Sequence, residues 1–270
     1  MMKRKRLLAI GCSYTSLYWT HKHGFPVWPQ LLAEKLDMDC INLGANGAGN
    51  THISGQLFDS IVEEKFDFIV IMWSEFQRMD FQELGLFDLQ EIDTYIPAGV
   101  WRKIVWQHLH PHRLTNYETY KLDPAAKNKL LKYNSIASST LAAFRLFWIT
   151  QNILKDIPYF MIQGCFPVGK PTLGPLFEHN EPYDYFNIIM KECIRFMLKS
   201  PYIDLIESKK FIGWPIMPQL GGFAVDHHLD KLDPEREKYR MEGSKDSHPN
   251  AVGHELISEL IYDNYKKVYS

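Results

Sequence analysis

Apolar runs alternate with segments of helical periodicity in the first quarter of the chain. The runs at residues 6–11, 38–43 and 66–72 predict strands, and the segments at 29–36 and 51–64 predict helices. The run at 66–72 is apolar almost throughout, which is typical of a central strand in a parallel sheet. Because the connections are short, the pattern predicts a parallel sheet with helices on both faces. In the second helix we expect the inward-facing residues to be Ile53, Leu57, Ile61 and Val62.

The same alternation resumes after residue 128. Helices are predicted at 130–155 and 183–199, strands at 158–163 and 203–206, and a closing helix at 250–269. With the first three strands, this predicts five parallel strands in the order 2-1-3-4-5. That order is the flavodoxin-like three-layer α/β/α sandwich, a fold of the α/β class. The first of these helices is expected to bury the apolar residues Ala137, Leu141, Phe144, Trp148 and Ile149.

The segment at 77–128 interrupts this alternation. It is rich in aromatic residues, histidine and proline and has no clean period, so we expect an irregular insertion of loops and short helices in a single domain of residues 1–270. Its aromatic side chains either line a sugar-binding lid or cover an apolar edge. Alternating histidines at 108–112 could chelate zinc, but no cysteine or carboxylate completes a ligand set nearby, so we expect a loop without metal.

Charge and composition exclude several classes of protein. The formal net charge is -2, and the one dense basic run, Lys3-Arg4-Lys5-Arg6, is expected to be a solvated tail, which argues against nucleic-acid binding. The apolar stretch that follows ends at Gly11 after four residues, too short for a signal peptide. No stretch approaches the roughly 20 apolar residues of a membrane span. The four cysteines are scattered without metal or redox spacing, so we expect a cytoplasmic protein with reduced thiols.

Two polar motifs lie near opposite ends of the chain. Gly11-Cys12-Ser13 follows the first strand, and Asp246-Ser247-His248 precedes the closing helix. A serine hydroxyl becomes a good nucleophile when an imidazole takes its proton and a carboxylate orients that imidazole. In a sheet of this order, sites lie at the carboxyl ends of the strands near the switch point. The pairing predicts a serine hydrolase, and the simpler alternatives are that Ser13 caps a helix and that His248 is an ordinary loop residue.

These motifs resemble the sequence blocks of the SGNH (GDSL-type) hydrolases, a superfamily of esterases, lipases and acyl hydrolases on a flavodoxin-like fold. Gly11-Cys12-Ser13 resembles the first block, Asn42 to Gly47 the second and Asp246-Ser247-His248 the last. Within the superfamily, the chain is most similar to small phage proteins that share Gly-Cys-Ser-Tyr-Thr, the Trp28-Pro29 helix start and the ending from His248 to His254. A phage origin would add the host cytoplasm or the virion as locations.

The resemblance implies a role for each motif residue. Ser13 would attack the ester carbonyl, His248 would act as general base and acid, and Asp246 would orient His248. The backbone N–H groups of Ser13 and Gly47 would form the oxyanion hole. The implied substrate is a small-molecule or glycan ester with a short acyl group such as acetyl, and no cofactor is needed.

The chain departs from the family pattern in three places. Cys12 replaces the usual Asp, Asp246 stands two residues before His248 instead of three, and the third block, Gly-x-Asn-Asp, is absent. Trp73-Ser74-Glu75-Phe76 stands there instead, so Ser74 or Asn46 would have to replace the missing Asn as an oxyanion donor, with Glu75 beside them. The missing Asn favours an alternative function, a phage structural or carbohydrate-binding protein that keeps the fold with weak or no catalysis.

Other polar residues have structural interpretations. Asn42 is expected to bond backbone near the glycine turn, Asn50 to cap the helix that follows it, and His254 to be structural. Arg78 is expected either to recognise an acidic group or to pair with Asp80. Four residues of one short segment are expected at the surface, namely Asp226, His227, His228 and Asp230.

Overall fold

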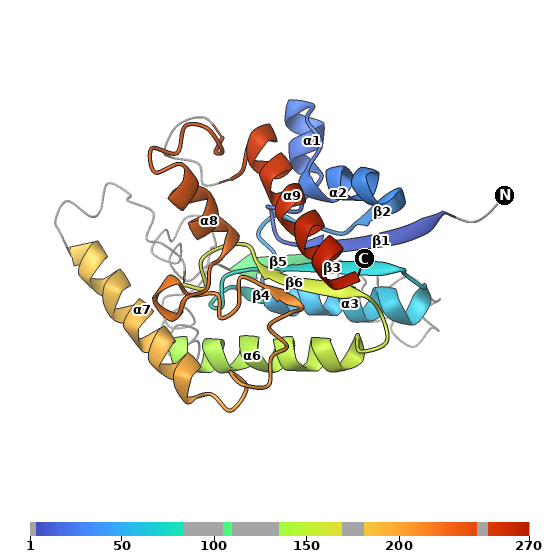
Figure 1. Cartoon of the computed structure of the whole chain (residues 1–270). Coiled ribbons are helices and arrows are strands. Elements are labelled where there is room, and N and C mark those ends of the chain that lie inside the picture. The colour runs from blue at the N-terminus through green and yellow to red at the C-terminus, as the bar shows by residue number, and fades with distance from the viewer. Residues whose placement is uncertain (1–3, 84–104, 110–134, 169–180, 242–247, 270) are drawn as a thin grey trace, which may run out of the picture.

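The computed structural model describes residues 4–83, 105–109, 135–168, 181–241 and 248–269. Its centre is a five-stranded parallel sheet in the order β2-β1-β3-β6-β7, with helices on both faces (Figure 1). Since β6 and β7 are the fourth and fifth strands of this sheet, the predicted order and the flavodoxin-like α/β fold are confirmed. The strands are β1 (Lys5–Gly11), β2 (Met38–Asn42), β3 (Phe68–Trp73), β6 (Tyr159–Gln163) and β7 (Phe211–Ile212).

Strand β3 forms the middle of the sheet, and all six of its residues are buried. Its Met72 lies opposite Gly11 of β1 on one side and Ile162 of β6 on the other. The three strands therefore end at the same edge of the sheet. The loops that follow Gly11, Trp73 and Gln163 leave this edge next to one another, and this edge carries the candidate site.

The helices form the two outer layers of the sandwich. Helix α2 (Trp28–Leu36) packs against α9 (Ala251–Tyr269) on one face, and α3 (Asn50–Glu63) packs against α6 (Ile136–Ile153) on the other (Figure 1). Helix α6 also contacts α7 (Glu181–Lys199). Three shorter helical segments complete the described part of the chain, namely α1 (Tyr18–His23), the 3-10 helix Pro218–Leu220 and α8 (Val225–Leu232).

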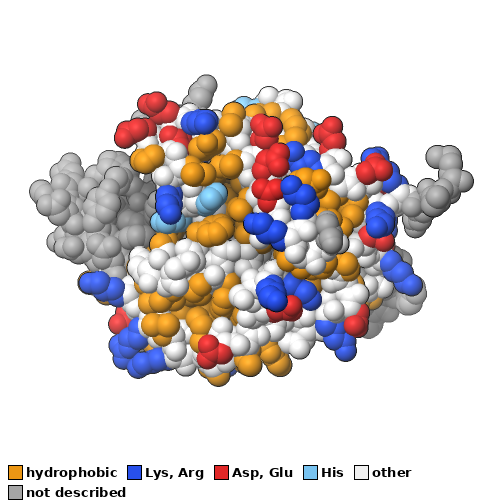
Figure 2. Space-filling view, in the orientation of Figure 1, with side chains coloured by type: hydrophobic (Ala, Val, Ile, Leu, Met, Phe, Trp, Pro, Cys, Tyr) orange, Lys and Arg blue, Asp and Glu red, His pale blue; other side chains and the backbone are white. Residues whose placement is uncertain are grey.

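Charged side chains of both signs are interspersed over α9 on the outer surface (Figure 2). An ion pair of 2.6 Å joins Lys35 of α2 to Glu259 of α9, and a second pair of 2.8 Å joins Lys266 to Asp263 within α9. The Lys35–Glu259 pair reinforces the contact between the two helices of this layer. Exposed pairs of this kind contribute about 0–1 kcal/mol each, so the packing of apolar residues decides where α9 lies.

Two predicted helix faces differ from the observed ones. In α3, Ile53 and Leu57 are buried as predicted, whereas Val62 is 82% exposed. In α6, Phe144 is buried as predicted. The prediction was wrong for Trp148 and Ile149, one turn further on, because both are exposed. Neighbouring residues on a helix point about 100° apart, so residues next to each other in the sequence cannot all face the sheet. The outward-facing apolar residues of α6 include Trp148, Ile149 and Ile153.

The predicted fifth strand at 203–206 was wrong. These residues form turns, in which the N–H of Leu205 donates to the carbonyl of Tyr202 at 3.0 Å, and the fifth strand is the two-residue β7 at 211–212. Short apolar runs do not distinguish a strand from a turn that packs on the core. The short helices α1 and α8 were not predicted, because six to eight residues carry too little periodicity.

The predicted irregular insertion contains regular structure. Strands β4 (Met79–Glu83) and β5 (Val105–Leu109) pair in an antiparallel sheet of two strands. Residues 84–104 and 110–128 of the segment, including the histidines at 110 and 112, lie outside the described residues. His108, which was expected in a loop, lies in β5. Within the described ranges, no helix is both long enough and apolar enough to cross a membrane.

Candidate functional site

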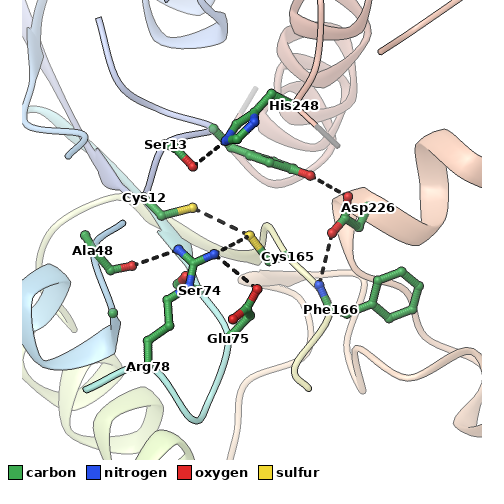
Figure 3. A network of polar contacts seen from close by, with 12 residues as sticks. Cys12, Ser13, Ala48, Ser74, Glu75, Arg78, Cys165, Phe166, Asp226 and His248 are labelled. Carbon is green, nitrogen blue, oxygen red and sulfur yellow. Dashed lines mark hydrogen bonds and ion pairs between the residues drawn. The ribbon is translucent and has the colours of Figure 1, made fainter. Parts of the chain in front are cut away.

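The turn after β1 presents Ser13 to His248. Ser13 Oγ and His248 Nε2 lie 2.8 Å apart, although 235 positions separate the two residues (Figure 3). The turn is tight because Thr15 N–H donates to the Cys12 carbonyl at 2.9 Å. It also needs glycine at position 11, because a Cβ there would lie 2.2 Å from Thr15 Oγ1. The cap position of α1 is Leu17, so the alternative that Ser13 caps a helix was wrong.

Two aromatic side chains hold the ring of His248, namely Tyr14 of the same turn and Trp19 of α1. The Trp19 ring lies 4.5 Å from it at 39°, and the Tyr14 ring lies 5.4 Å from it at 62°. Trp19 Nε1 also donates to the carbonyl of Ser13 at 2.7 Å, so one indole supports both partners of the Ser13–His248 pair. Tyr14 and Trp19 were not predicted as parts of the site, although their positions one and six residues after Ser13 were a usable signal.

The backbone on both sides of His248 is also held. Met241 N–H donates to the His248 carbonyl at 2.9 Å. Asn250 caps α9 by accepting the N–H of Gly253 at 3.0 Å, which fixes the point where the helix begins. The predicted third member of the triad, Asp246, lies outside the described residues. Its role therefore stays a prediction.

The glycine turn after β2 is bonded directly to the turn that carries Ser13. Asn42 donates through Nδ2 to the Thr15 carbonyl at 2.7 Å and accepts the Gly44 N–H at 2.8 Å, as predicted for its side chain. A Cβ on Gly44 would lie 2.5 Å from the Thr15 carbonyl carbon, so the two turns touch. Gly47 has φ of 80°, a conformation that favours glycine. Among the described residues, none accepts a hydrogen bond from the N–H of Ser13 or of Gly47.

The segment after β3 is fixed by Asn50. Asn50 Oδ1 accepts the N–H of Ser74 at 2.8 Å, and its Nδ2 donates to the Ser74 carbonyl at 3.3 Å. Gln163 Nε2 donates to the same carbonyl at 2.8 Å. Ser74 is fully buried, whereas Asn46, the other predicted replacement for the missing Asn, is exposed. The three bonds from Asn50 and Gln163 hold the Ser74 backbone at the end of β3.

The prediction that Asn50 caps α3 was wrong, because its amide is used by Ser74. Asp80 takes that place: its carboxylate accepts the N–H of Gly49 and the N–H of His52, each at 2.8 Å. A carboxylate at this end of a helix satisfies free N–H groups and faces the positive end of the helix dipole. Asp80 thus joins the start of β4 to the start of α3.

Glu75 and Arg78 form a buried ion pair of 3.1 Å below the turn that carries Ser13 (Figure 3). Arg78 also donates through Nη1 to the Ala48 carbonyl at 3.2 Å and lies 3.8 Å from Cys165 Sγ. The Arg78 side chain is 8% exposed, and the Glu75 side chain is 14% exposed. Glu75 therefore does not stand alone as a negative charge near an oxyanion. Arg78 was expected either to recognise an acidic group or to pair with Asp80. Neither expectation named Glu75, which is its ion-pair partner.

Two buried thiols complete this layer. Cys12 Sγ and Cys165 Sγ lie 3.7 Å apart. The hydrogen bond from Cys165 lowers the pKa of the Cys12 thiol, and the positive charge of Arg78 adds to this, whereas the pKa of Cys165 is raised. In the described part of the chain, no group of three or more histidine, cysteine, aspartate or glutamate side chains could hold a metal ion.

The expected surface segment at 226–230 lies partly in the interior. Asp226 is buried and accepts the Tyr14 hydroxyl at 2.5 Å and the N–H of Phe166 at 3.3 Å. Burial raises the pKa of Tyr14 well above its usual value, and the Asp226 charge adds to this, so the phenol stays protonated and donates. His228 is half-buried, and burial lowers its pKa. The sequence prediction failed because Asp226 of α8 faces inward and forms an ion pair with the buried Arg240.

His254 is buried beneath the site and accepts the N–H of Trp28 at 3.3 Å, in agreement with a structural role. Burial, with a smaller contribution from His248, lowers its pKa to about 3. An unfolded histidine binds a proton near pH 6.5, whereas the folded protein resists protonation down to pH 3. The unfolded state therefore binds more protons in this window, and stability falls as the pH falls.

We expect the His254→Gln variant to lose this part of the pH dependence. Glutamine keeps an acceptor for Trp28 and does not titrate. In the wild type, His254 should remove about 2 kcal/mol of unfolding free energy between pH 7 and pH 5, and the variant should lack this loss. Urea unfolding at both pH values measures it. An equal loss in the two proteins would show that His254 takes up its proton in the folded state.

Neither the protein-family models nor the curated proteins give a match to this sequence. Solved structures do match. The structural neighbours include lipolytic proteins of the G-D-S-L family. The phage-like branch stays a prediction from the motifs.

Three of these neighbours illustrate the range. A lipase/acylhydrolase from Enterococcus faecalis has 13% identity and a TM-score of 0.45, with 97% of this chain and 96% of that chain covered. A catalytic mutant of the acetylxylan esterase Axe2 from Geobacillus stearothermophilus has 10% identity and a TM-score of 0.46, with 98% and 96% covered. A G-D-S-L family protein from Veillonella parvula has 10% identity and a TM-score of 0.42, with 98% of each chain covered.

Proposed function

We propose that the protein is a serine esterase in which Ser13 is the nucleophile, His248 the general base and acid, and Asp246 the residue that orients His248. The observation that carries the proposal is the 2.8 Å contact between Ser13 Oγ and His248 Nε2 at the carboxyl edge of the sheet. In the first step, His248 takes the hydroxyl proton as Ser13 Oγ bonds to the ester carbonyl carbon. The alcohol then leaves with that proton, and water releases the acid by the reverse route.

The proposed oxyanion hole consists of the N–H groups of Ser13 and Gly47. Both belong to turns that are bonded to each other through Asn42 and Gly44, which keeps donors of this kind fixed in place. Each such donor contributes about 3 kcal/mol to transition-state stabilisation. The third sequence block is absent, and we propose that the rigid Ser13 turn and the two backbone donors act without its Asn.

The surroundings of Ser13 favour a short acyl group. Ser13 is 8% exposed, and Tyr14 and Trp19 pack on the imidazole beside it, so there is little room for a long chain next to the hydroxyl. We therefore propose an acetyl-like ester of a small molecule or a glycan, hydrolysed without a cofactor by one domain that spans residues 1–270. The carbohydrate as alcohol and the phage origin rest on the resemblance of the motifs.

A fluorophosphonate probe tests the proposal directly. An activated serine attacks the phosphorus, fluoride leaves, and the protein gains the mass of the phosphonyl group. We expect the adduct on Ser13 and not on Ser16 of the same peptide, together with release of p-nitrophenol from p-nitrophenyl acetate. If neither the adduct nor hydrolysis of p-nitrophenyl acetate or an acetylated polysaccharide is found, the proposal is wrong. The alternative of a carbohydrate-binding or structural phage protein would then stand.

A further inference from the structure

Arg240 is a buried cation outside the Ser13–His248 pair. Its side chain is 1% exposed. Nη2 lies 2.9 Å from a carboxylate oxygen of Asp226 and 2.6 Å from one of Asp230, both on α8. The same nitrogen also donates to the backbone carbonyl of Asp226 at 2.8 Å. Three oxygen atoms of α8 thus fix the position of this guanidinium.

The backbone of the same residue carries the chain on which His248 stands. Arg240 forms an antiparallel bridge with Pro249, the residue after His248. Met241 N–H donates to the His248 carbonyl at 2.9 Å, and Asn250 N–H donates to the Tyr239 carbonyl at 3.1 Å. Asn250 Nδ2 adds a bond of 2.9 Å to the Arg240 carbonyl. The position of the His248 backbone therefore follows that of residues 239–241.

A second path leads from Arg240 to the nucleophile. Arg240 Nη1 donates to the Tyr14 hydroxyl at 3.2 Å, and this hydroxyl donates to Asp226. Tyr14 directly follows Ser13, and its ring packs on the ring of His248. The contacts form a closed circuit: Ser13 to Tyr14, to Arg240, to the His248 segment and back to Ser13.

We propose that Arg240 is a positioning residue that sets the distance between His248 and Ser13. The inference rests on the proposed function, because it names the residue that aligns the same pair. A buried ion pair adds little net stability, since desolvation of the charges offsets their attraction. Arg240 contributes fixed geometry instead of stability. Its planar guanidinium contacts Tyr14, Asp226 and Asp230 at the same time, which the single ammonium group of a lysine could not do.

The first arm of the test is kinetic. Arg240→Met keeps much of the apolar stem and removes the guanidinium. We expect kcat for p-nitrophenyl acetate to fall about 10- to 100-fold, because displacement of reacting groups by about 1 Å has effects of that size. KM should stay within about twofold, because Arg240 is buried and does not face the substrate. The control Lys35→Met removes an ion pair between α2 and α9, and its kcat should match the wild type.

The second arm is independent of activity. In the wild type, the rings of Trp19 and Tyr14 shift the NMR signals of the His248 ring protons, which are assigned by their loss in His248→Gln. In Arg240→Met these signals should move toward those of a free histidine. A folded Arg240→Met with unchanged kcat and unchanged His248 signals would overturn the proposal.

A milder variant covers the case in which Arg240→Met does not fold. Tyr14→Phe keeps the ring on His248 and removes the hydroxyl that Arg240 and Asp226 share. We expect a lower kcat at unchanged KM and a shift of the His248 signals. No change in either would overturn the proposal. If the wild type hydrolyses no ester, the proposed function fails, while the NMR signals of the two variants still decide whether Arg240 positions His248.

Discussion

Replacement of Ser13 by alanine is expected to lower kcat for p-nitrophenyl acetate by roughly 10⁴-fold or more, since the covalent step has no other nucleophile. The fold should be unaffected, because the Ser13 backbone is held by the Trp19 indole and its side chain bonds to His248. Substrate binding should change little, so the loss should appear in kcat and not in KM. Steady-state kinetics with a circular dichroism spectrum of both proteins measure this result.

A matched control for Ser13→Ala lies three residues along the same turn. Ser16 is also buried, and its hydroxyl accepts the N–H of Tyr18 at 3.2 Å. Ser16→Ala should therefore cost some stability at the start of α1 and leave kcat close to the wild-type value. Equal hydrolysis by the wild type and Ser13→Ala would mean that the reaction takes place without Ser13, and the proposed mechanism would be abandoned.

Replacement of His248 by glutamine is expected to be almost as damaging. Glutamine can still accept a hydrogen bond from Ser13 but cannot take its proton, so kcat should fall by roughly 10⁴-fold or more. Without a side-chain base beside Ser13 Oγ, the variant depends on hydroxide, so its small remaining rate should rise about tenfold for each pH unit. The wild-type rate should not follow hydroxide in this way. Rates measured from pH 5 to pH 9 separate the two.

The control for His248→Gln is a histidine of α1 that faces solvent. His21 is exposed and lies on the helix that follows the Ser13 turn. His21→Gln should keep both the rate and the pH profile of the wild type. A normal profile in His248→Gln would assign the general base to another group, and the 2.8 Å contact with Ser13 would then be structural only.

The sequence predicted those parts of the site that lie where a strand or a helix ends. Ser13 follows a buried strand and His248 precedes a long amphipathic helix, so both could be placed at the edge of the sheet from the sequence alone. The order of the strands followed from the same alternation of strand and helix. Local pattern was sufficient to place the strands, the helices and their ends, because each of these depends on residues close in the sequence, and the rules for connecting parallel strands then give the order.

The parts that failed depend on residues far apart in the sequence. The network of Arg240 joins Tyr14 to Asp226, which stands 212 positions later, and no local motif marks either partner. Asn50 has the residue type of a helix cap. In the folded protein Asp80 caps the helix instead, and the Asn50 amide bonds to the Ser74 backbone. Which side chain accepts a given N–H group depends on which acceptor lies nearest in the folded protein, and spacing along the chain does not show this.

The distance in sequence between Ser13 and His248 has a consequence for how the protein is made. The turn that holds Ser13 is completed early in synthesis, when β1, β2 and β3 can already pair. Its partner arrives on the chain 235 positions later, with the segment that pairs with residues 239–241. A nascent or truncated chain therefore carries the hydroxyl without the imidazole. The proposed chemistry is switched on only when the carboxyl-terminal segment has folded back onto the sheet.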